Sequence, residues 1–158
     1  MTRRILATMA LVLGASNAAM AQTANQTVTF QVDAINQIAL SGSPSLLINT
    51  AVAGNSPTSA TANATWAVTT NQTGAKITAS IGSNMPSGLT LSANLAAPAG
   101  ASTAGSLSLS TTAVDLVTGI TKLAQSGLSV TYTLDATPAA GVVSSATRTV
   151  TYTITGGT

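Results

Sequence analysis

Hydrophobic and polar residues alternate along most of this chain, and a period of two predicts β-strands with one buried face. The alternation is strictest in residues 128–134 and 150–154, where Leu, Val, Ile and Tyr are separated by Ser or Thr. Thr branches at Cβ and therefore favours an extended backbone. The same pattern recurs in residues 27–32, 65–69, 76–81, 89–95 and 106–110.

Short breaks rich in Pro, Gly, Asn and Ser separate these runs and are typical of turns. They fall at residues 43–45, 55–57, 71–74, 85–88, 98–100 and 138–141. Short strands with such breaks predict an all-β fold, a single Ig-like antiparallel β-sandwich of about seven to nine strands. Residues 35–40 and 46–48 are predicted to be further strand pieces.

Residues 115–126 fit the strand pattern less well. Leu116, Ile120 and Leu123 follow a helical spacing, but the β-favouring Val117 and the intervening Gly119 weaken a helix. We expect a short strand followed by an irregular crossover, with a short helix as the alternative.

The first residues have the pattern of an export signal. Arg3 and Arg4 precede an apolar stretch at residues 5–14, which is too short to span a bilayer, and residues 19–21 form a small-x-small cleavage site. We therefore expect a signal peptide at residues 1–21 and one β-sandwich domain at residues 22–158. The protein is expected to be secreted, or held at the cell surface or in the periplasm, without membrane insertion after cleavage.

Charge excludes one class of partner. The chain carries five Lys and Arg against three Asp and no Glu, a net charge of +2. Arg3 and Arg4 account for this excess, so the exported protein is expected to be near neutral. Lys76, Lys122 and Arg148 lie far apart in the sequence, and nucleic-acid binding has no electrostatic support.

Catalytic chemistry has few candidate groups. The chain contains no Cys and no His, so a Ser or Thr nucleophile lacks its usual base, and neither Lys lies in a Ser-x-x-Lys motif. A carboxylate pair would need two of Asp33, Asp115 and Asp135 to meet in space, and a calcium site would need all three, but each is better explained as a turn or strand-end residue. We expect no enzyme, no metal and no cofactor.

Two further features have competing interpretations. Trp66, the single Trp, shares its predicted strand face with Val68, which favours a core position over a sugar-stacking platform. Asn25, Asn63 and Asn71 each begin a formal glycosylation triplet, but such triplets arise readily by chance in a Thr-rich chain.

Residues 22–33 carry a clear strand pattern in Val28, Phe30 and Val32. The simpler interpretation is an ordinary first strand of the domain; the alternative is a strand that adds to the sheet of a neighbouring molecule. Residues 129–134 and 149–155 are β-prone and uncharged apart from their flanks, so exposed edges there would be weakly protected. Self-association through strand edges is the partner prediction.

The export signal, the Thr-rich alternating strands and the closing residues 148–154 resemble those of small bacterial surface proteins with Ig-like sandwiches. Residues 66–68, Trp-Ala-Val, are also similar to the WxL-type cell-surface modules, with Val in place of Leu. The chain departs from fimbrial subunits, since it lacks their Cys pair. From the missing reactive groups and the weakly protected edges we expect a structural, non-enzymatic surface protein that self-associates into a layer or filament; a secreted module that binds carbohydrate or another small ligand is the alternative.

Overall fold

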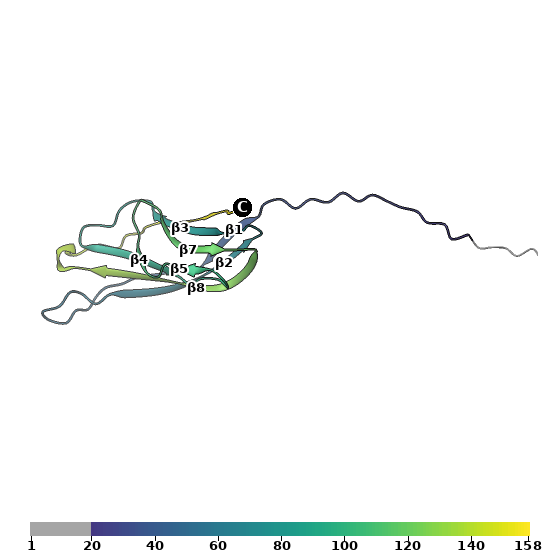
Figure 1. The fold of residues 1–158 in the computed structure, drawn as a ribbon. Coiled ribbons are helices and arrows are strands. Elements are labelled where there is room, and N and C mark those ends of the chain that lie inside the picture. The colour runs from purple at the N-terminus through teal and green to yellow at the C-terminus, as the bar shows by residue number, and fades with distance from the viewer. Residues whose placement is uncertain (1–19) are drawn as a thin grey trace, which may run out of the picture. The chain divides into compact units, whose positions relative to one another are not determined.

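The computed structural model describes residues 20–158 and shows two antiparallel sheets packed face to face (Figure 1). One sheet has five strands in the order β1-β2-β8-β4-β6, and the other has four in the order β5-β7-β3-β9. The strands are β1 (Asn36–Ser41), β2 (Ala60–Thr70), β3 (Ala75–Ile81), β4 (Leu89–Leu95), β5 (Ser102–Thr103), β6 (Leu107–Ser108), β7 (Val114–Ile120), β8 (Leu123–Ala136) and β9 (Val150–Thr155). The predicted all-β sandwich is therefore confirmed.

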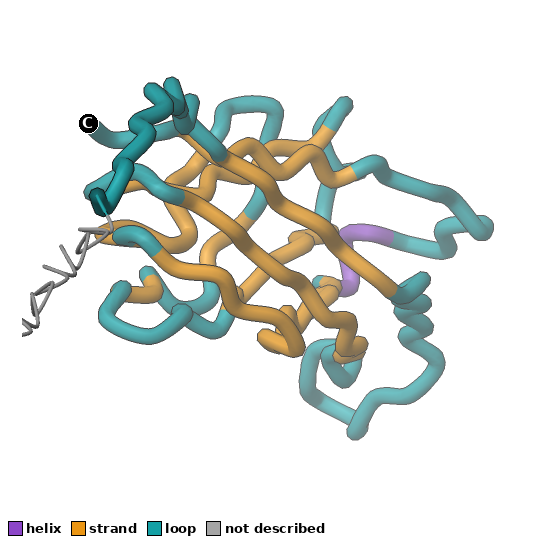
Figure 2. The backbone as a smooth tube through the Cα atoms, turned by 90° about the vertical axis from the view of Figure 1, so that its right-hand side faces the viewer, coloured by secondary structure: helices purple, strands orange, loops and turns teal. Residues whose placement is uncertain are grey.

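The antiparallel pairing places the loops at two ends of the sandwich, and Figure 2 traces the backbone through the strands and these loops. At one end, which we call the Asn71 end, the β2–β3 turn lies beside the start of β1 and the end of β9, and Thr73 pairs with Thr158 through two backbone hydrogen bonds. At the other end, the loop end, lie the β1–β2, β3–β4 and β8–β9 connections.

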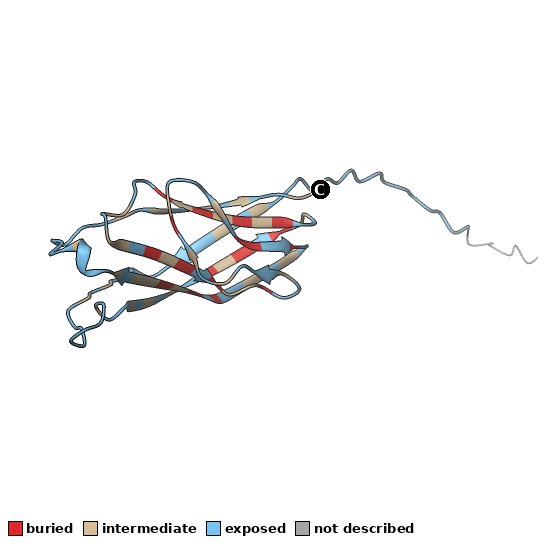
Figure 3. Ribbon diagram, turned by 60° about the vertical axis from the view of Figure 1, so that its left-hand side comes forward, coloured by how far each residue is buried: buried red, intermediate tan, exposed pale blue. Residues whose placement is uncertain are grey.

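The core lies between the two sheets and follows the predicted period of two (Figure 3). In β3, every second residue is buried, and Ile77 is completely inaccessible. The largest fully buried side chains come from both sheets and from β2, β3, β4, β7 and β8: Trp66, Ile77, Leu95, Leu116, Ile120, Val68, Val117 and Val130. Packing of apolar side chains from both layers thus stabilises a domain that contains no disulfide.

A close backbone contact fixes the loop end. Gly88 has φ +80°, and a Cβ built on it would lie 2.5 Å from the backbone nitrogen of Ala140 in the β8–β9 loop. The carbonyl oxygen of Gly88 accepts a hydrogen bond from the Thr137 amide at 2.8 Å. Glycine is needed here because it tolerates both the left-handed backbone and the close approach.

The region between residues 115 and 126 contains no helix. Strand β7 ends at Ile120, two residues cross to the other sheet, and β8 starts at Leu123. The predicted strand and crossover are confirmed, although the crossover is much shorter than expected. The short helix is wrong because strand pairing of β8 with β2 begins directly at Leu123. The only helical turn among the described residues is a 3-10 turn at Pro138–Ala140.

Two other predicted strands differ from the structure. Residues 46–48 form no strand and belong to the long β1–β2 connection, which has a single bridge between Ala51 and Pro57. Residues 27–32 also form no strand, so the prediction of an ordinary first strand of the domain is wrong.

The chain divides into two units, Met1–Val32 and Asp33–Thr158. All nine strands belong to the second unit. Of the first unit, the structure describes residues 20–32, which are exposed throughout and have no regular structure. The predicted signal peptide at residues 1–21 lies almost entirely outside the described residues. No helix in the described part is long and apolar enough to cross a membrane.

Candidate functional site: the β9 edge and residues 27–32

Residues 27–32, the donor segment, have a strand pattern without a strand. Val28, Phe30 and Val32 are 73%, 89% and 78% exposed. Soluble proteins rarely leave a regular series of large apolar side chains in water, and such a series marks an interaction site. The segment carries no charged residue that would favour solvation.

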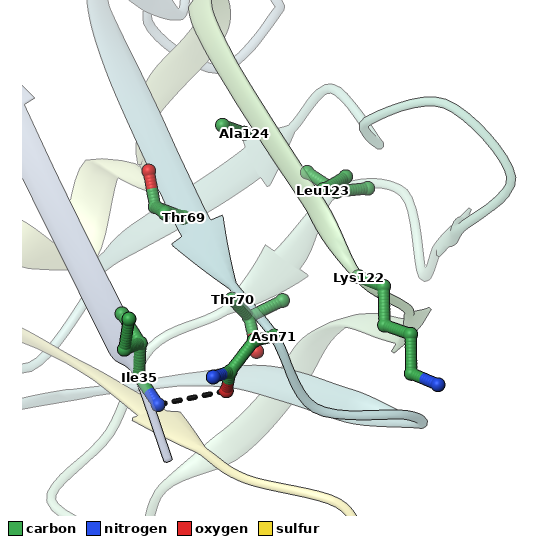
Figure 4. A pocket seen from close by; sticks show the side chains of 7 residues that line it. All are labelled: Ile35, Thr69, Thr70, Asn71, Lys122, Leu123 and Ala124. Atoms are coloured by element: carbon green, nitrogen blue, oxygen red, sulfur yellow. Dashed lines mark hydrogen bonds between the residues drawn. The ribbon is translucent and has the colours of Figure 1, made fainter. Parts of the chain in front are cut away.

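Asn71 anchors the chain at the point where the sandwich begins (Figure 4). Its side-chain oxygen accepts the backbone N–H of Ile35 at 2.8 Å, and its Nδ2 donates to the carbonyl oxygen of Asp33 at 2.7 Å. The backbone N–H of Asn71 also donates to the Ile35 carbonyl at 3.2 Å. These three bonds fix the position of Asp33 and Ile35 against the β2–β3 turn.

Strand β9 forms the edge of the four-stranded sheet, and its inward face is only partly covered. Tyr152 and Ile154 lie opposite Ala79 and Ile77 of β3 in the strand register. The β3 residues are at most 1% exposed, whereas Tyr152 and Ile154 remain partly exposed. The side chains of β9 are therefore less buried than those of β3, because no described strand is hydrogen-bonded to the far side of β9, although β1 of the other sheet comes close to it.

The backbone of β9 offers hydrogen-bonding groups at this edge. The Gly82 amide donates to the Thr149 carbonyl. In this register the backbone N–H and C=O groups of the odd-numbered residues of β9 are directed at β3. In an antiparallel ladder the intervening residues direct both N–H and C=O to the opposite side. The peptide groups of Val150, Tyr152 and Ile154 consequently point to the open edge.

The β9 edge lacks the usual protection against strand pairing. Exposed edges in soluble proteins are commonly blunted by charge, Pro, bulges or very short length. Strand β9 has six residues and contains neither charge nor Pro. By contrast, the edge strands β5 and β6 have two residues each. Strand β1, the remaining edge, has only Ile38 and Leu40 as large apolar residues.

A tyrosine pair connects β9 to the opposite sheet. The Tyr152 hydroxyl donates to the Tyr132 hydroxyl of β8 at 2.8 Å. Burial raises the pKa of Tyr152 above its ordinary value, and the bond to Tyr132 raises it further. Tyr132 is 6% exposed, and Tyr152 is partly buried against the core. The bond links the edge strand β9 to the opposite sheet.

Trp66 belongs to the core, as the sequence pattern favours. Its side chain is 1% exposed, and its register partner on β1 is Leu40. A buried Trp cannot stack on a sugar ring, so a sugar platform at Trp66 is wrong. Its Nε1 is buried without a hydrogen-bond partner in the described structure.

The three Asp residues lie on different parts of the fold. Asp115 of β7 forms an ion pair with Lys76 of β3 at 3.0 Å, and both side chains are about half exposed. Asp135 accepts a hydrogen bond from Ser59 near the loop end, whereas Asp33 precedes β1 at the Asn71 end. Among the described residues no three acidic, His or Cys side chains gather as a metal site.

Two of the three asparagines that begin glycosylation triplets form side-chain hydrogen bonds within the sandwich. Asn63 accepts a hydrogen bond from the Thr131 hydroxyl at 2.8 Å across β2 and β8. Asn71 is the anchor described above. The sequence indicated Asn71 only as a turn residue and as the start of a triplet, and its anchoring role was missed because the partner residues are more than thirty positions away.

Two shallow hollows lie on the surface of the sandwich. One, of about 370 Å³, lies at the Asn71 end beside Ile35, Asn71 and Lys122 (Figure 4). The other, of about 230 Å³, lies over Leu40 and Trp66. Neither hollow brings several charged side chains together, so neither has the convergent polar groups typical of a small-molecule site.

Comparison of the chain with protein-family models, with curated proteins and with solved structures finds no match.

Proposed function

We propose that this protein is an exported, non-enzymatic structural subunit that associates with further copies of itself at the cell surface or in an extracellular layer or filament. The observation that carries this proposal is the coexistence of two incomplete surfaces in one chain. Residues 27–32 expose three regularly spaced apolar side chains, and β9 has an unprotected edge with a partly covered face.

Energetics favour covering these surfaces. Complete burial of one Val or Phe side chain contributes about 1.5–3 kcal/mol. Backbone hydrogen bonds at a sheet edge add affinity and direction. Other apolar side chains are exposed at the loop end, among them Leu47 at 73%, Val52 at 66% and Val142 at 102%. Association would bury these apolar side chains, so the surfaces favour an assembly over a monomer.

Composition supports a non-catalytic role. The chain lacks Cys, His and Glu, and the described ionisable groups are dispersed over both sheets. Its outer strand positions are dominated by Thr and Ser, which are neutral and hydrogen-bond readily. The surface, and not a catalytic pocket, therefore carries the function in this proposal.

Sedimentation velocity and negative-stain microscopy of the protein lacking residues 1–21 test the proposal. We expect oligomers whose size increases with protein concentration, and extended or layered particles on the grid. A single monomeric species at every concentration up to the millimolar range would contradict it.

A further inference from the structure

We propose that residues 27–32 of one copy add to the free edge of β9 in a second copy as an antiparallel strand, which completes the four-stranded sheet and links subunits head to tail. This inference rests on the proposed function, since it requires that copies associate. It goes further by naming the two contacting segments, their register and their direction.

The strand order shows where a strand is missing. In an Ig-type sandwich, strands A, B, E and D form one sheet and C, F and G the other. Strands β1, β2, β8 and β4 occur in the sheet order of A, B, E and D, and β3 and β9 take the places of C and F. Chain order agrees with this correspondence for these six strands, whereas β5, β6 and β7 fall between the places of D and E. The place of strand G, beyond β9, is unfilled by any described strand.

The donor segment matches this place in length and pattern. Residues 27–32 equal β9 in length, and both alternate apolar residues with polar, uncharged ones. With Phe30 opposite Tyr152, the antiparallel register sets Val28 opposite Ile154 and Val32 opposite Val150. All three donor side chains then lie over the partly covered face, where cross-strand aromatic and β-branched pairs stabilise a sheet.

Strand direction decides between pairing within one chain and pairing between chains. Asn71 holds Asp33 at the end of the sandwich where β9 finishes. An antiparallel donor must instead end beside Val150, about 20 Å away along a six-residue strand. Residue 32 cannot lie there while residue 33 of the same chain is held at Asn71. Antiparallel addition is therefore possible only between two copies, whereas a parallel donor would fit within one chain.

Antiparallel addition also allows an unlimited series of copies, each donating its strand to the next. The donor strand leaves the recipient at the loop end, so the body of the donor copy lies next to the recipient's exposed Leu47, Val52 and Val142. The recipient's own chain enters its sandwich at Asp33, which Asn71 holds at the opposite end, so its Val28, Phe30 and Val32 can add to a third copy. Such a heterologous contact, repeated without closure, produces a filament.

Paired cysteines test the register, and the natural chain offers no competing thiol. Thr29 and Thr153 are exposed and directly opposed in the proposed register. We expect the double variant T29C/T153C to form a ladder of disulfide-linked oligomers on non-reducing gels. The matched control, T29C/T151C, opposes its two thiols only in a parallel register, and we expect little cross-linking from it.

The outcomes separate this inference from the proposed function. Self-association of the natural protein without a T29C/T153C ladder would overturn the strand register but leave self-association standing. A monomer closed by an internal disulfide in T29C/T151C would show parallel pairing within one chain and would overturn the inference. Absence of self-association in the natural protein would overturn both.

A substitution pair gives a second readout. F30D places a charge on the donor face that enters the recipient, whereas the control T29D places the same charge on the opposite face. Loss of one buried Phe contact corresponds to a reduction in association of about tenfold or more. We expect F30D to show this reduction and T29D to associate nearly as the natural protein does. Because residues 27–32 are exposed and form no strand, both variants should keep the unfolding midpoint of the sandwich; equal association of the two would contradict the inference.

Discussion

The hydroxyl groups of Tyr152 and Tyr132 are joined by a hydrogen bond of 2.8 Å that spans the two sheets next to the open edge. Tyr152 belongs to the outermost strand of the four-stranded sheet, and Tyr132 lies in the middle of the five-stranded one. The pair thus connects a partly covered edge strand to the central strand of the opposite sheet.

This pair predicts a loss of stability at alkaline pH. The folded state raises the pKa of Tyr152 above its unfolded value near 10. A raised tyrosine pKa means that the unfolded state loses its proton first, so the free energy of unfolding should be constant below about pH 10 and fall above it, by at most about 1.4 kcal/mol per pH unit. Urea unfolding at several pH values from 8 to 11.5 measures this effect.

The control is Y152F, which removes the titrating hydroxyl and keeps the ring. Its stability should be lower than that of the natural protein at pH 8, by about 1 kcal/mol for the lost hydrogen bond. The decline above pH 10 should be shallower. An identical decline in both proteins would assign the alkaline sensitivity to other groups.

Removal of the Asn71 side chain should weaken the start of the sandwich. N71A leaves the Ile35 amide without its side-chain acceptor and the Asp33 carbonyl without its donor. We expect a loss of about 1–2 kcal/mol in the free energy of unfolding, together with faster amide exchange at Ile35. N63A, which removes one exposed side-chain bond to Thr131, is a suitable comparison and should leave exchange at Ile35 unchanged.

A methyl group at Gly88 should be far more damaging than one at Gly100. Both glycines have positive φ, +80° and +77°, so both alanine variants incur the left-handed backbone penalty of about 1–2 kcal/mol. Only at Gly88 would the new Cβ collide with the Ala140 backbone, because nothing lies within 4 Å of a Cβ at Gly100. Thermal unfolding should place G88A clearly below G100A; equal melting temperatures would mean that the β8–β9 loop moves aside freely.

Trp66 should tolerate Phe much better than Ala. W66A opens a large cavity in the core and should cost about 3–5 kcal/mol. W66F keeps most of the ring volume and removes an indole N–H that is buried without a partner, which partly offsets the lost contacts. Denaturant unfolding of the two variants measures the difference. A W66F variant as unstable as W66A would indicate that Nε1 has a partner, such as a buried water.

The fold was largely predictable because a period of two appears directly in the residues of a strand. The core positions of Trp66, Ile77 and Val130 follow from that pattern. The same pattern could not show whether residues 27–32 have a partner strand within the chain, because alternation describes a strand's two faces and says nothing about its edges. The donor segment was therefore predicted as an ordinary first strand.

The position of β9 at a sheet edge was equally inaccessible to sequence reasoning. Residues 130–134 and 150–154 are near copies, yet Val130 is completely buried in a central strand, whereas Val150 begins an edge strand. Long-range pairing decides between these environments. Likewise the anchoring role of Asn71 depends on contacts with Asp33 and Ile35, which no local motif records.

The anchoring of Asp33 has a mechanical consequence. A pull on the chain at Asp33 that is directed along β1 acts on a strand that is paired with β2 over all six of its residues. Because ladder hydrogen bonds run perpendicular to the strands, such a pull loads all of them in shear at the same time. They therefore do not break one after another from one end of the ladder. Tension applied through this end would be distributed over the whole β1–β2 ladder, a geometry suited to a load-bearing connection.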